Sequence, residues 1–387
     1  MLGYIPFGGG DFADVAGVAA RVGEGDDNDF YEAWMAAGDR VRAEAGRVDA
    51  AGHPKSAGDL YLRASAHYAS AYHPLYGTPV DPRLLEAYRR QISCFEAGLA
   101  RRKKPVLRQD VEFEGATLPL YLIPAEGHED EPRPTIIFIN GYDATVTDVF
   151  FASAVAALRR GYHCVVFDGP GQGGVLYEQG VPLRPDWETV TSAAIDAIVS
   201  SPIVDQDRIA VSGWSLGGYL APRAASGERR IAACVADPGQ WDLGAAVARL
   251  LLQFGASESE ASGQQPLGEE VLKAVEAYVA GNRMLHWAIV QRGFWANGVS
   301  DLSSFLDRTR EFTSRDLVGQ IDCPVLLTRA ENDPLAADVA EMAAAIPNAM
   351  VMDFTAADGA GEHCEMSNRS LLNRRVLDWL DEVLVAN

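Results

Sequence analysis

A serine between two glycines lies at the junction of an apolar run and an amphipathic run. The residues at 213–217 match the pattern Gly-x-Ser-x-Gly with Ser215 at the centre, after an apolar run at 208–212 and before an amphipathic run at 218–225. A tight strand-to-helix turn of this kind holds its serine in a strained conformation and exposes the hydroxyl, as in a nucleophile elbow. By itself the motif also fits an ordinary glycine-rich turn before a helix. It predicts a nucleophilic serine if a base and an acid are found elsewhere.

A serine hydroxyl is a weak nucleophile and needs a base, which an acid has to orient. Only two histidines follow Ser215, namely His286 and His363. His363 lies in a glycine-containing loop after the last strand-like run, at 349–354, which is where an open α/β sheet brings a histidine to an elbow serine. We therefore predict His363 as the base, and we expect His286 to be a core or substrate-contacting residue.

Carboxylates for orienting the base follow the strand-like run at 324–327. Asp333 has the usual offset from the end of that strand and is preferred to Glu331, while Asp338 is expected on the next helix. A surface-loop carboxylate is the alternative interpretation for all three.

Two backbone N–H groups are needed to stabilise an oxyanion. Leu216 directly follows the nucleophile and provides one, and the Tyr142 N–H, in the loop after the run at 135–139, is expected to provide the other. Gly141 allows a close backbone approach in that loop, and Asp143 either faces the pocket or stabilises the turn.

Other motifs do not predict a cofactor. The glycine-rich residues 168–173 lack both the Lys-Ser/Thr of a P-loop and the spacing of a dinucleotide site, so we interpret them as a tight crossover. No His, Cys and Asp spacing is typical of a metal site. Cys364 follows His363 and is an alternative nucleophile, although Ser215 already fills that role.

Composition limits the class of protein. The chain has 387 residues, a formal net charge of −21 and five cysteines without paired spacing, which favour a large globular protein with free thiols. So acidic a chain is a poor partner for nucleic acid. No apolar run reaches the roughly 20 residues that span a bilayer, and the N-terminus does not resemble a signal peptide, so we expect a cytoplasmic protein without a membrane partner.

The order of elements predicts an α/β fold. Helical periodicity dominates the first hundred residues, with a loop expected through Asp29, and a hairpin is expected after residue 110. Alternating strand-like and helical runs follow, which indicates a mostly parallel eight-stranded sheet. We expect four parts: an N-terminal helical segment that contributes to a cap, a first part of the core, a helical cap insertion after the sixth strand, and a second part of the core. They cover 1–107, 108–240, 241–320 and 321–387.

The insertion has no strand-like run and is rich in large apolar residues, including Trp287 and Trp295. Such a segment either packs only its own core or also covers the carboxyl ends of the strands, where open sheets bind ligands. We expect it to cover the nucleophile, and we count Gly141, Asp143, Trp214, His286 and Trp287 as candidate substrate-binding residues.

These motifs resemble those of the alpha/beta-hydrolase superfamily over residues 110–387. The runs at 168–173, 213–223 and 361–364 resemble most closely the group of 2,6-dihydroxypseudooxynicotine hydrolase and the fungal polyketide-shortening hydrolases, which is related to the fermentation-respiration switch protein. The resemblance implies hydrolysis of a carbon–carbon bond beside a ketone, a helical cap and a homodimer. Ala330 replaces a glycine that often precedes the acid in this family.

The sequence therefore predicts a cofactor-independent serine hydrolase with Ser215, His363 and Asp333 as its triad. Its expected partner is an apolar or aromatic, polyketide-like ketone or ester. An esterase, a thioesterase or an acyl-transfer cyclase could use the same triad, because the pocket selects the bond. A non-catalytic binding protein on a hydrolase scaffold is the alternative of another class.

Overall fold

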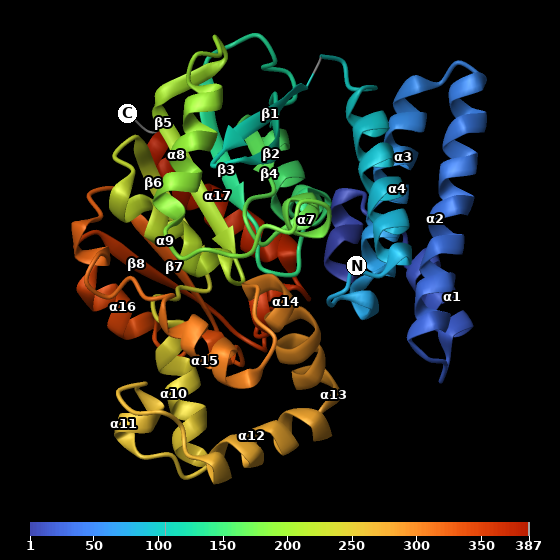
Figure 1. Ribbon diagram of the computed structural model, residues 1–387. Helices are drawn as coiled ribbons and strands as arrows, with labels where there is room; N and C mark the ends of the chain where they lie inside the picture. Colours follow the sequence, from blue (N-terminus) through green and yellow to red (C-terminus); the bar gives the residue numbers. More distant parts are fainter. Residues whose placement is uncertain (105, 386–387) are drawn as a thin grey trace.

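Eight strands form one sheet, in the order β1-β2-β4-β3-β5-β6-β7-β8 (Figure 1). The computed structural model describes residues 1–104 and 106–385. β1 pairs antiparallel with β2 and β2 with β4, whereas every other neighbouring pair is parallel. The expected mostly parallel eight-stranded sheet is thus confirmed. The strands are β1 (Leu107–Phe113), β2 (Ala116–Ile123), β3 (Arg133–Ile139), β4 (His163–Phe167), β5 (Val204–Trp214), β6 (Ile231–Asp237), β7 (Val325–Ala330) and β8 (Ala349–Phe354).

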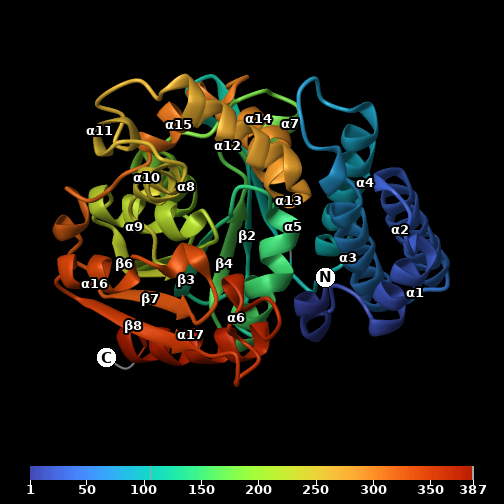
Figure 2. The same ribbon diagram turned by 90° about the horizontal axis from the view of Figure 1, so that it is seen from below.

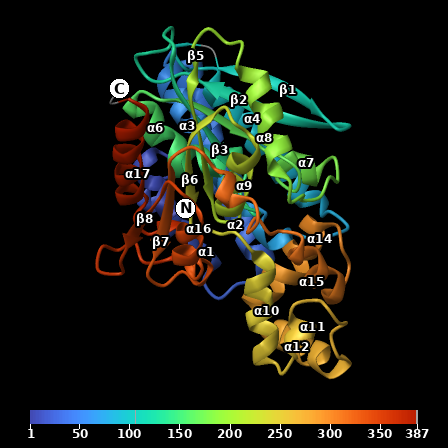
Figure 3. The same cartoon turned by 90° about the vertical axis from the view of Figure 1, so that its left-hand side faces the viewer.

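Helices cover both faces of this sheet, as its continuously apolar inner strands require. One face carries α6 (Val155–Arg160) and α17 (Arg369–Leu384), and the other carries α8 (Trp187–Ile198), α9 (Gly217–Gly227) and α16 (Val339–Ala345) (Figures 2 and 3). The central strand β4 is buried along its whole length. Because β3, β5, β6, β7 and β8 are parallel, their carboxyl ends lie at one edge of this three-layer core.

The N-terminal helices stand side by side against the end of the sheet at β1 and β2 (Figure 1). They comprise a 3₁₀ helix at Leu2–Phe7, α1 (Phe12–Val22), α2 (Asp27–Ala50), α3 (Pro54–Ala71), a 3₁₀ helix at His73–Leu75 and α4 (Pro82–Leu99). The prediction of a loop through Asp29 was wrong. Acidic capping boxes at Asp11 and Asp26 start two helices there, and most of the glycines lie outside them.

The helical insertion, residues 241–320, leaves the core after β6 and returns before β7. Within the described chain it contains helices, turns and one isolated bridge, between Asp242 and Thr313. Leu251, Val279 and Leu306 belong to a small hydrophobic core of its own. The helical elements are α10 (Leu243–Gln253), α11 (Glu258–Ala261), α12 (Glu269–Gly281), α13 (Arg283–Leu285), a π-helix (His286–Gly293), α14 (Phe294–Asn297), α15 (Leu302–Arg310) and a 3₁₀ helix (Val318–Gln320).

An aromatic cluster joins the insertion to the N-terminal segment and to α7 (Gly173–Tyr177). The ring centroids of Tyr177 and Trp295 are 5.2 Å apart, and those of Tyr76 and Trp287 are 5.9 Å apart. The Trp287 indole also donates a hydrogen bond to the His73 carbonyl at 2.7 Å. The three parts of the chain are therefore packed together beside the carboxyl end of β3.

Shorter elements complete the chain. They are α5 (Val146–Val149), a π-helix (Phe150–Ala154) and 3₁₀ helices at Pro334–Ala336 and His363–Glu365. None of the described helices combines the length and apolarity needed to cross a membrane.

Candidate active site

Ser215 occupies the turn between β5 and α9 in a left-handed backbone conformation, with φ of 57°. Its N–H donates to the Asp237 carbonyl at 2.6 Å, and its own carbonyl accepts from the Gly218 N–H at 2.8 Å. A Cβ at Gly213 would overlap the Gly217 carbonyl oxygen, so the first glycine is required by space. The turn fixes a strained, partly exposed serine at the end of a central strand.

His363 brings its imidazole to this serine from the loop after β8. Its Nε2 lies 3.0 Å from Ser215 Oγ, and its Nδ1 lies 2.7 Å from Asp333 Oδ2. A carboxylate can only accept, so Nδ1 donates to Asp333 and Nε2 of the neutral ring is left as the acceptor for the hydroxyl. Asp333 and His363 lie 118 and 148 positions after Ser215 in the sequence, and they meet it in one Ser–His–Asp arrangement.

The charge on this arrangement favours the protonated imidazole. Burial of the His363 ring lowers its pKa, but the hydrogen bond and charge of Asp333 oppose this, and Asp237 and Asp143 add negative potential. The net result is a pKa raised above the ordinary value of 6.5. The ring is therefore a stronger base than a free histidine.

Asp333 is the carboxylate that the fold brings to His363. Its Oδ1 accepts from the Leu335 N–H at 2.9 Å, which leaves Oδ2 for the imidazole. The competing carboxylates are used elsewhere: Glu331 accepts from the Ala356 N–H at 2.8 Å, and Asp338 pairs with Arg249 at 3.0 Å.

The loop after β3 passes directly behind Ser215. A Cβ at Gly141 would stand 2.8 Å from Ser215 Cβ, so only glycine fits this approach. No hydrogen bond within the described chain uses the N–H of Leu216 or of Tyr142. Both predicted oxyanion donors are thus unoccupied by protein acceptors.

Arg292 connects the insertion to this loop. Its guanidinium is fully buried and donates to the carbonyls of Tyr142 and, at 3.2 Å, Gly171. Its Cζ lies 4.7 Å from the Tyr76 ring centroid and 5.3 Å from that of Trp295. Charge, aromatic faces and hydrogen bonds together attach the insertion to the loop that faces Ser215.

The candidate substrate-binding residues have different surroundings. Trp287 packs in the aromatic cluster, with its ring 6.5 Å from that of His73, and the half-buried His286 begins the same π-helix. The Asp143 carbonyl accepts from the Tyr76 hydroxyl at 2.9 Å, while its carboxylate adds to the potential at His363. Asp143 belongs to the loop after β3, and His286 and Trp287 belong to the insertion, which packs beside that loop.

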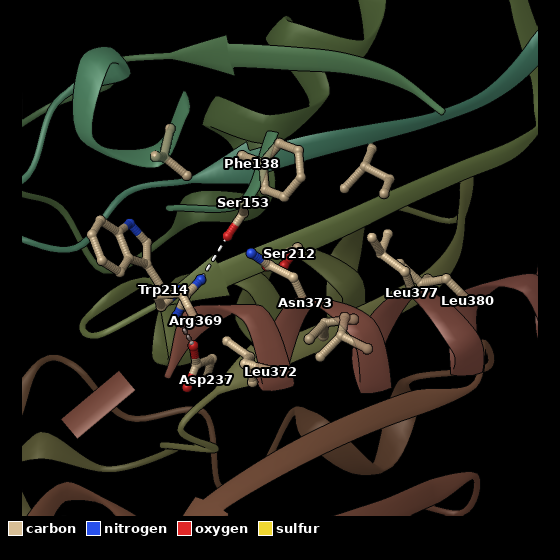
Figure 4. A pocket seen from close by; sticks show the side chains of 14 residues that line it. Phe138, Ser153, Ser212, Trp214, Asp237, Arg369, Leu372, Asn373, Leu377 and Leu380 are labelled. Carbon is tan, nitrogen blue, oxygen red and sulfur yellow. Dashed lines mark hydrogen bonds and ion pairs between the residues drawn. The ribbon is translucent and has the colours of Figure 1, made fainter. Parts of the chain in front are cut away.

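Trp214 has a different position. Its indole lies 5.5 Å from the Arg369 guanidinium and lines a small cavity of about 20 Å³ between the sheet and α17 (Figure 4). We therefore do not include Trp214 among the substrate contacts proposed below.

Behind the loop that carries His363, Arg369 is buried in a polar cluster (Figure 4). It pairs with Asp237 at 2.9 Å and donates to the Cys364 carbonyl at 2.7 Å and to Ser153 Oγ at 2.6 Å. Glu365, also buried, has both carboxylate oxygens unpartnered in the described structure. Burial and the negative charge of Asp237 raise the Glu365 pKa far above its usual range, so this group stays protonated at neutral pH.

Cys364 lies next to His363, with its Sγ 3.4 Å from His363 Nε2. Burial and the negative charge of Asp237 raise the pKa of its thiol well above the ordinary value. The thiol remains protonated and is a poor nucleophile there. All five cysteines are free, and the described residues include no group of three or more His, Cys, Asp or Glu side chains arranged for a metal ion.

The glycine-rich residues 168–173 are held by their own side chains. Asp168 accepts from Asn140 Nδ2 at 3.0 Å, and Gln172 Oε1 accepts from the Gly169 N–H at 3.0 Å. Burial, followed by the charge of Asp148, raises the Asp168 pKa to about 8. Through the bonds of Asp168 and Gln172 to Asn140, the loop is attached to the segment after β3.

Sequence reasoning missed several residues that hold the site together. Tyr76, Gln240 and Arg292 carry no local motif, because their roles depend on contacts between distant segments. Gln172 stands between Gly171 and Gly173 in the glycine-rich run at 168–173, and this position is the one local signal for its role.

Comparisons with known proteins show the family of this chain. The model of the Alpha/beta hydrolase family matches residues 136–369. Hydrolase LUC6 of Fusarium sp is 30% identical and covers 99% of this chain and 94% of its own length. The 20-hydroxy-prefusarin hydrolase FUS2 of Gibberella moniliformis is 32% identical over 85% of this chain and 80% of its own.

Among solved structures, the 2,6-dihydroxy-pseudo-oxynicotine hydrolase superposes with a TM-score of 0.74 at 25% identity, over 99% of this chain and 96% of its own. This confirms the resemblance seen in the motifs. The chain belongs to the alpha/beta hydrolase family and is a hydrolase.

Proposed function

We propose that the chain is a cofactor-independent serine hydrolase in which Ser215 is the nucleophile, His363 the base and Asp333 the orienting acid. The contacts of 3.0 Å between Ser215 Oγ and His363 Nε2 and of 2.7 Å between His363 Nδ1 and Asp333 carry the proposal. The half-exposed imidazole, 41% accessible, can exchange protons with a bound substrate, while the Asp333 side chain is 1% exposed. Distances of this kind are those expected of a nucleophile, its base and the group that orients the base.

The first chemical step moves one proton and forms one bond. Ser215 Oγ attacks a substrate carbonyl carbon while His363 Nε2 takes the hydroxyl proton. The carbonyl oxygen becomes an oxyanion that accepts hydrogen bonds from the N–H groups of Leu216 and Tyr142. Loss of one such donor typically raises the barrier by about 3–4 kcal/mol.

We further propose that the bond broken is a carbon–carbon bond beside a ketone. Collapse of the oxyanion expels a carbanion whose electron pair is delocalised onto the neighbouring carbonyl, and His363 returns the proton to that carbon. Water then hydrolyses the acyl group on Ser215. The balance is one β-diketone plus water giving one carboxylic acid and one ketone.

Two observations support this choice of substrate class. The solved 2,6-dihydroxy-pseudo-oxynicotine hydrolase aligns over nearly the whole chain, including the helical insertion and the N-terminal helices. Aromatic residues of those two parts, among them His73, Tyr76 and Trp287, gather beside the oxyanion loop. We propose that these parts act as a cap over an aromatic or polyketide-like substrate.

The test compares two substrates on the purified chain. We expect 1-phenylbutane-1,3-dione to be hydrolysed to an acid and a ketone, and 4-nitrophenyl acetate to be turned over more slowly. Ser215→Ala should abolish both reactions. Ser226→Ala, which removes a buried hydroxyl bonded to the Arg223 carbonyl at 2.8 Å, should keep them.

Hydrolysis of the ester alone would reject carbon–carbon cleavage as the main activity and would favour an esterase. If Ser215→Ala had no effect on either substrate, the proposed nucleophile would be wrong.

A further inference from the structure

The Leu216 N–H, the first proposed oxyanion donor, belongs to the peptide between Ser215 and Leu216. The side chain of Gln240 holds the carbonyl of this peptide. The Leu216 N–H shares its peptide plane with the Ser215 carbonyl, and Gln240 Nε2 donates to that carbonyl at 2.6 Å. Gln240 is nearly buried, and its own N–H donates to the Gly218 carbonyl at 3.3 Å. The glutamine is thus attached to the turn that it holds.

The peptide of the second proposed donor, the Tyr142 N–H, is also held at its carbonyl by a glutamine side chain. The Tyr142 N–H shares its peptide plane with the Gly141 carbonyl, and Gln172 Nε2 donates to that carbonyl at 3.3 Å and to the Asn140 carbonyl at 2.8 Å. Gln172 is fully buried. Because its Oε1 accepts a hydrogen bond from the Gly169 N–H at 3.0 Å, the orientation of the Gln172 amide is fixed and Nε2 is the donor.

A trans peptide is planar, with its N–H and C=O pointing in opposite directions. A hydrogen bond that holds the carbonyl therefore also sets the direction of the N–H across the same plane. A primary amide does this without adding a charge near the developing oxyanion.

We propose that Gln172 and Gln240 are positioning residues that aim the N–H groups of Tyr142 and Leu216 at the oxyanion. The inference rests on the proposed function, since it assumes that Ser215 attacks an acyl or phosphoryl centre. Each glutamine acts through a peptide and touches no substrate.

The next two carbonyls of the same loop are also held. The Tyr142 carbonyl accepts from Arg292, and the Asp143 carbonyl accepts from the Tyr76 hydroxyl at 2.9 Å. Rotation of the Tyr142 peptide would thus disturb neighbours that are themselves fixed. Loss of Gln172 is expected to misdirect one donor rather than to release the whole loop.

The size of the effect follows from the geometry required for catalysis. A misplacement of about 1 Å costs on the order of 100-fold in rate, and loss of an oxyanion donor costs about 100- to 1,000-fold. We expect Gln172→Met and Gln240→Met each to lower the rate of attack by Ser215 about 10- to 100-fold.

A pair of organophosphates provides a test that needs no natural substrate. Diethyl 4-nitrophenyl phosphate and its phosphorothioate analogue differ only in P=O against P=S, and sulfur is the poorer acceptor for the two N–H groups. Ser215 Oγ bonds to phosphorus, 4-nitrophenolate leaves, and the serine proton passes to His363. The measurement is the ratio of the two phosphorylation rate constants, with the adduct located on Ser215 by mass spectrometry.

We expect the oxygen-to-sulfur ratio to fall at least fivefold in Gln172→Met and in Gln240→Met. Gln91→Met is the matched control: Gln91 is also fully buried, but it donates to the hydroxyl of Thr145 at 2.7 Å rather than to the Gly141 or Ser215 carbonyl. A general loss of packing would slow both reagents alike, so the control should keep the wild-type ratio. Gln172→Leu and Gln240→Leu, which also remove the donor and add no charge, replace any methionine variant that does not fold.

The outcomes separate the two proposals. If wild type forms the Ser215 adduct and the glutamine variants keep its ratio, the positioning role is overturned while the proposed function stands. If wild type forms no adduct on Ser215, the proposed function is overturned and the positioning role falls with it.

Discussion

The carboxylate of Asp333 is buried to 1% exposure, yet it lies 2.7 Å from the imidazole of His363, which is 41% exposed. This contact holds the imidazolium form and contributes to the raised His363 pKa. A general base works only when deprotonated, so activity should rise with pH through this pKa. We predict that kcat/KM for 4-nitrophenyl acetate has an acidic limb above pH 6.5, the ordinary histidine value.

Removing the carboxylate should move that limb. In Asp333→Asn the charge that raises the His363 pKa is lost, so the limb shifts to lower pH, and kcat falls by about 10⁴-fold as the ring loses its orientation. Glu331→Gln is the control because Glu331 holds the Ala356 N–H rather than the imidazole. A limb that stays in place in Asp333→Asn would exclude Asp333 as the orienting acid.

The pair between Arg369 and Asp237 should be important for stability. Both side chains are nearly inaccessible, at 1% and 5% exposure, so removing one partner leaves a buried charge uncompensated. We predict that Arg369→Met lowers the free energy of unfolding by about 3–5 kcal/mol, measured by urea denaturation.

Arg160→Met is the matched control. Its pairs with Asp378 and Asp381 are partly exposed, and such surface pairs contribute about 0–1 kcal/mol. Equal losses in the two variants would contradict the role assigned to the buried pair.

Glu365 should make the wild-type protein less stable as pH rises. Its pKa is raised in the folded state, so above the ordinary value of 4.5 the unfolded chain releases a proton that the folded chain keeps. Glu365→Gln removes this titration. We predict that its free energy of unfolding, relative to wild type, increases between pH 5 and pH 8, by at most about 1.4 kcal/mol per pH unit.

Urea denaturation at several pH values checks this prediction. A difference between Glu365→Gln and wild type that stays constant across the range would mean that the Glu365 pKa is ordinary.

Cys364 should be dispensable for catalysis although it stands beside the base. Its buried thiol stays protonated, and Ser215 has the closer contact with His363 Nε2, 3.0 Å against 3.4 Å. We predict that Cys364→Ala keeps ester turnover within about threefold of wild type, and that the native thiol resists alkylation at pH 8. Loss of activity to the level of Ser215→Ala would assign nucleophilic chemistry to the thiol.

Much of the fold could be predicted from the sequence because its signals are local. Continuous apolar runs marked the inner strands, and the helical periodicity of the first hundred residues corresponds to α2, α3 and α4. The helices before residue 29 were missed because glycine-rich flanks concealed two acidic capping boxes. The expected homodimer stays a prediction.

The candidate site was predictable to the extent that chain order determines it. Ser215 follows β5, Asp333 follows β7 and His363 follows β8, and because these strands are parallel the sheet brings the three residues to one edge. Gln240 and Arg292 could not be found in this way. Each acts through a backbone carbonyl of another segment, and no local pattern specifies such a contact.

The carbonyls of residues 140–143 are held by Gln172, Arg292 and Tyr76, which come from three separate stretches of the chain. Three segments that are distant in the sequence therefore fix the backbone of one four-residue loop beside Ser215. A substitution in the insertion or in the N-terminal segment can therefore alter the backbone beside Ser215 without touching Ser215, His363 or Asp333.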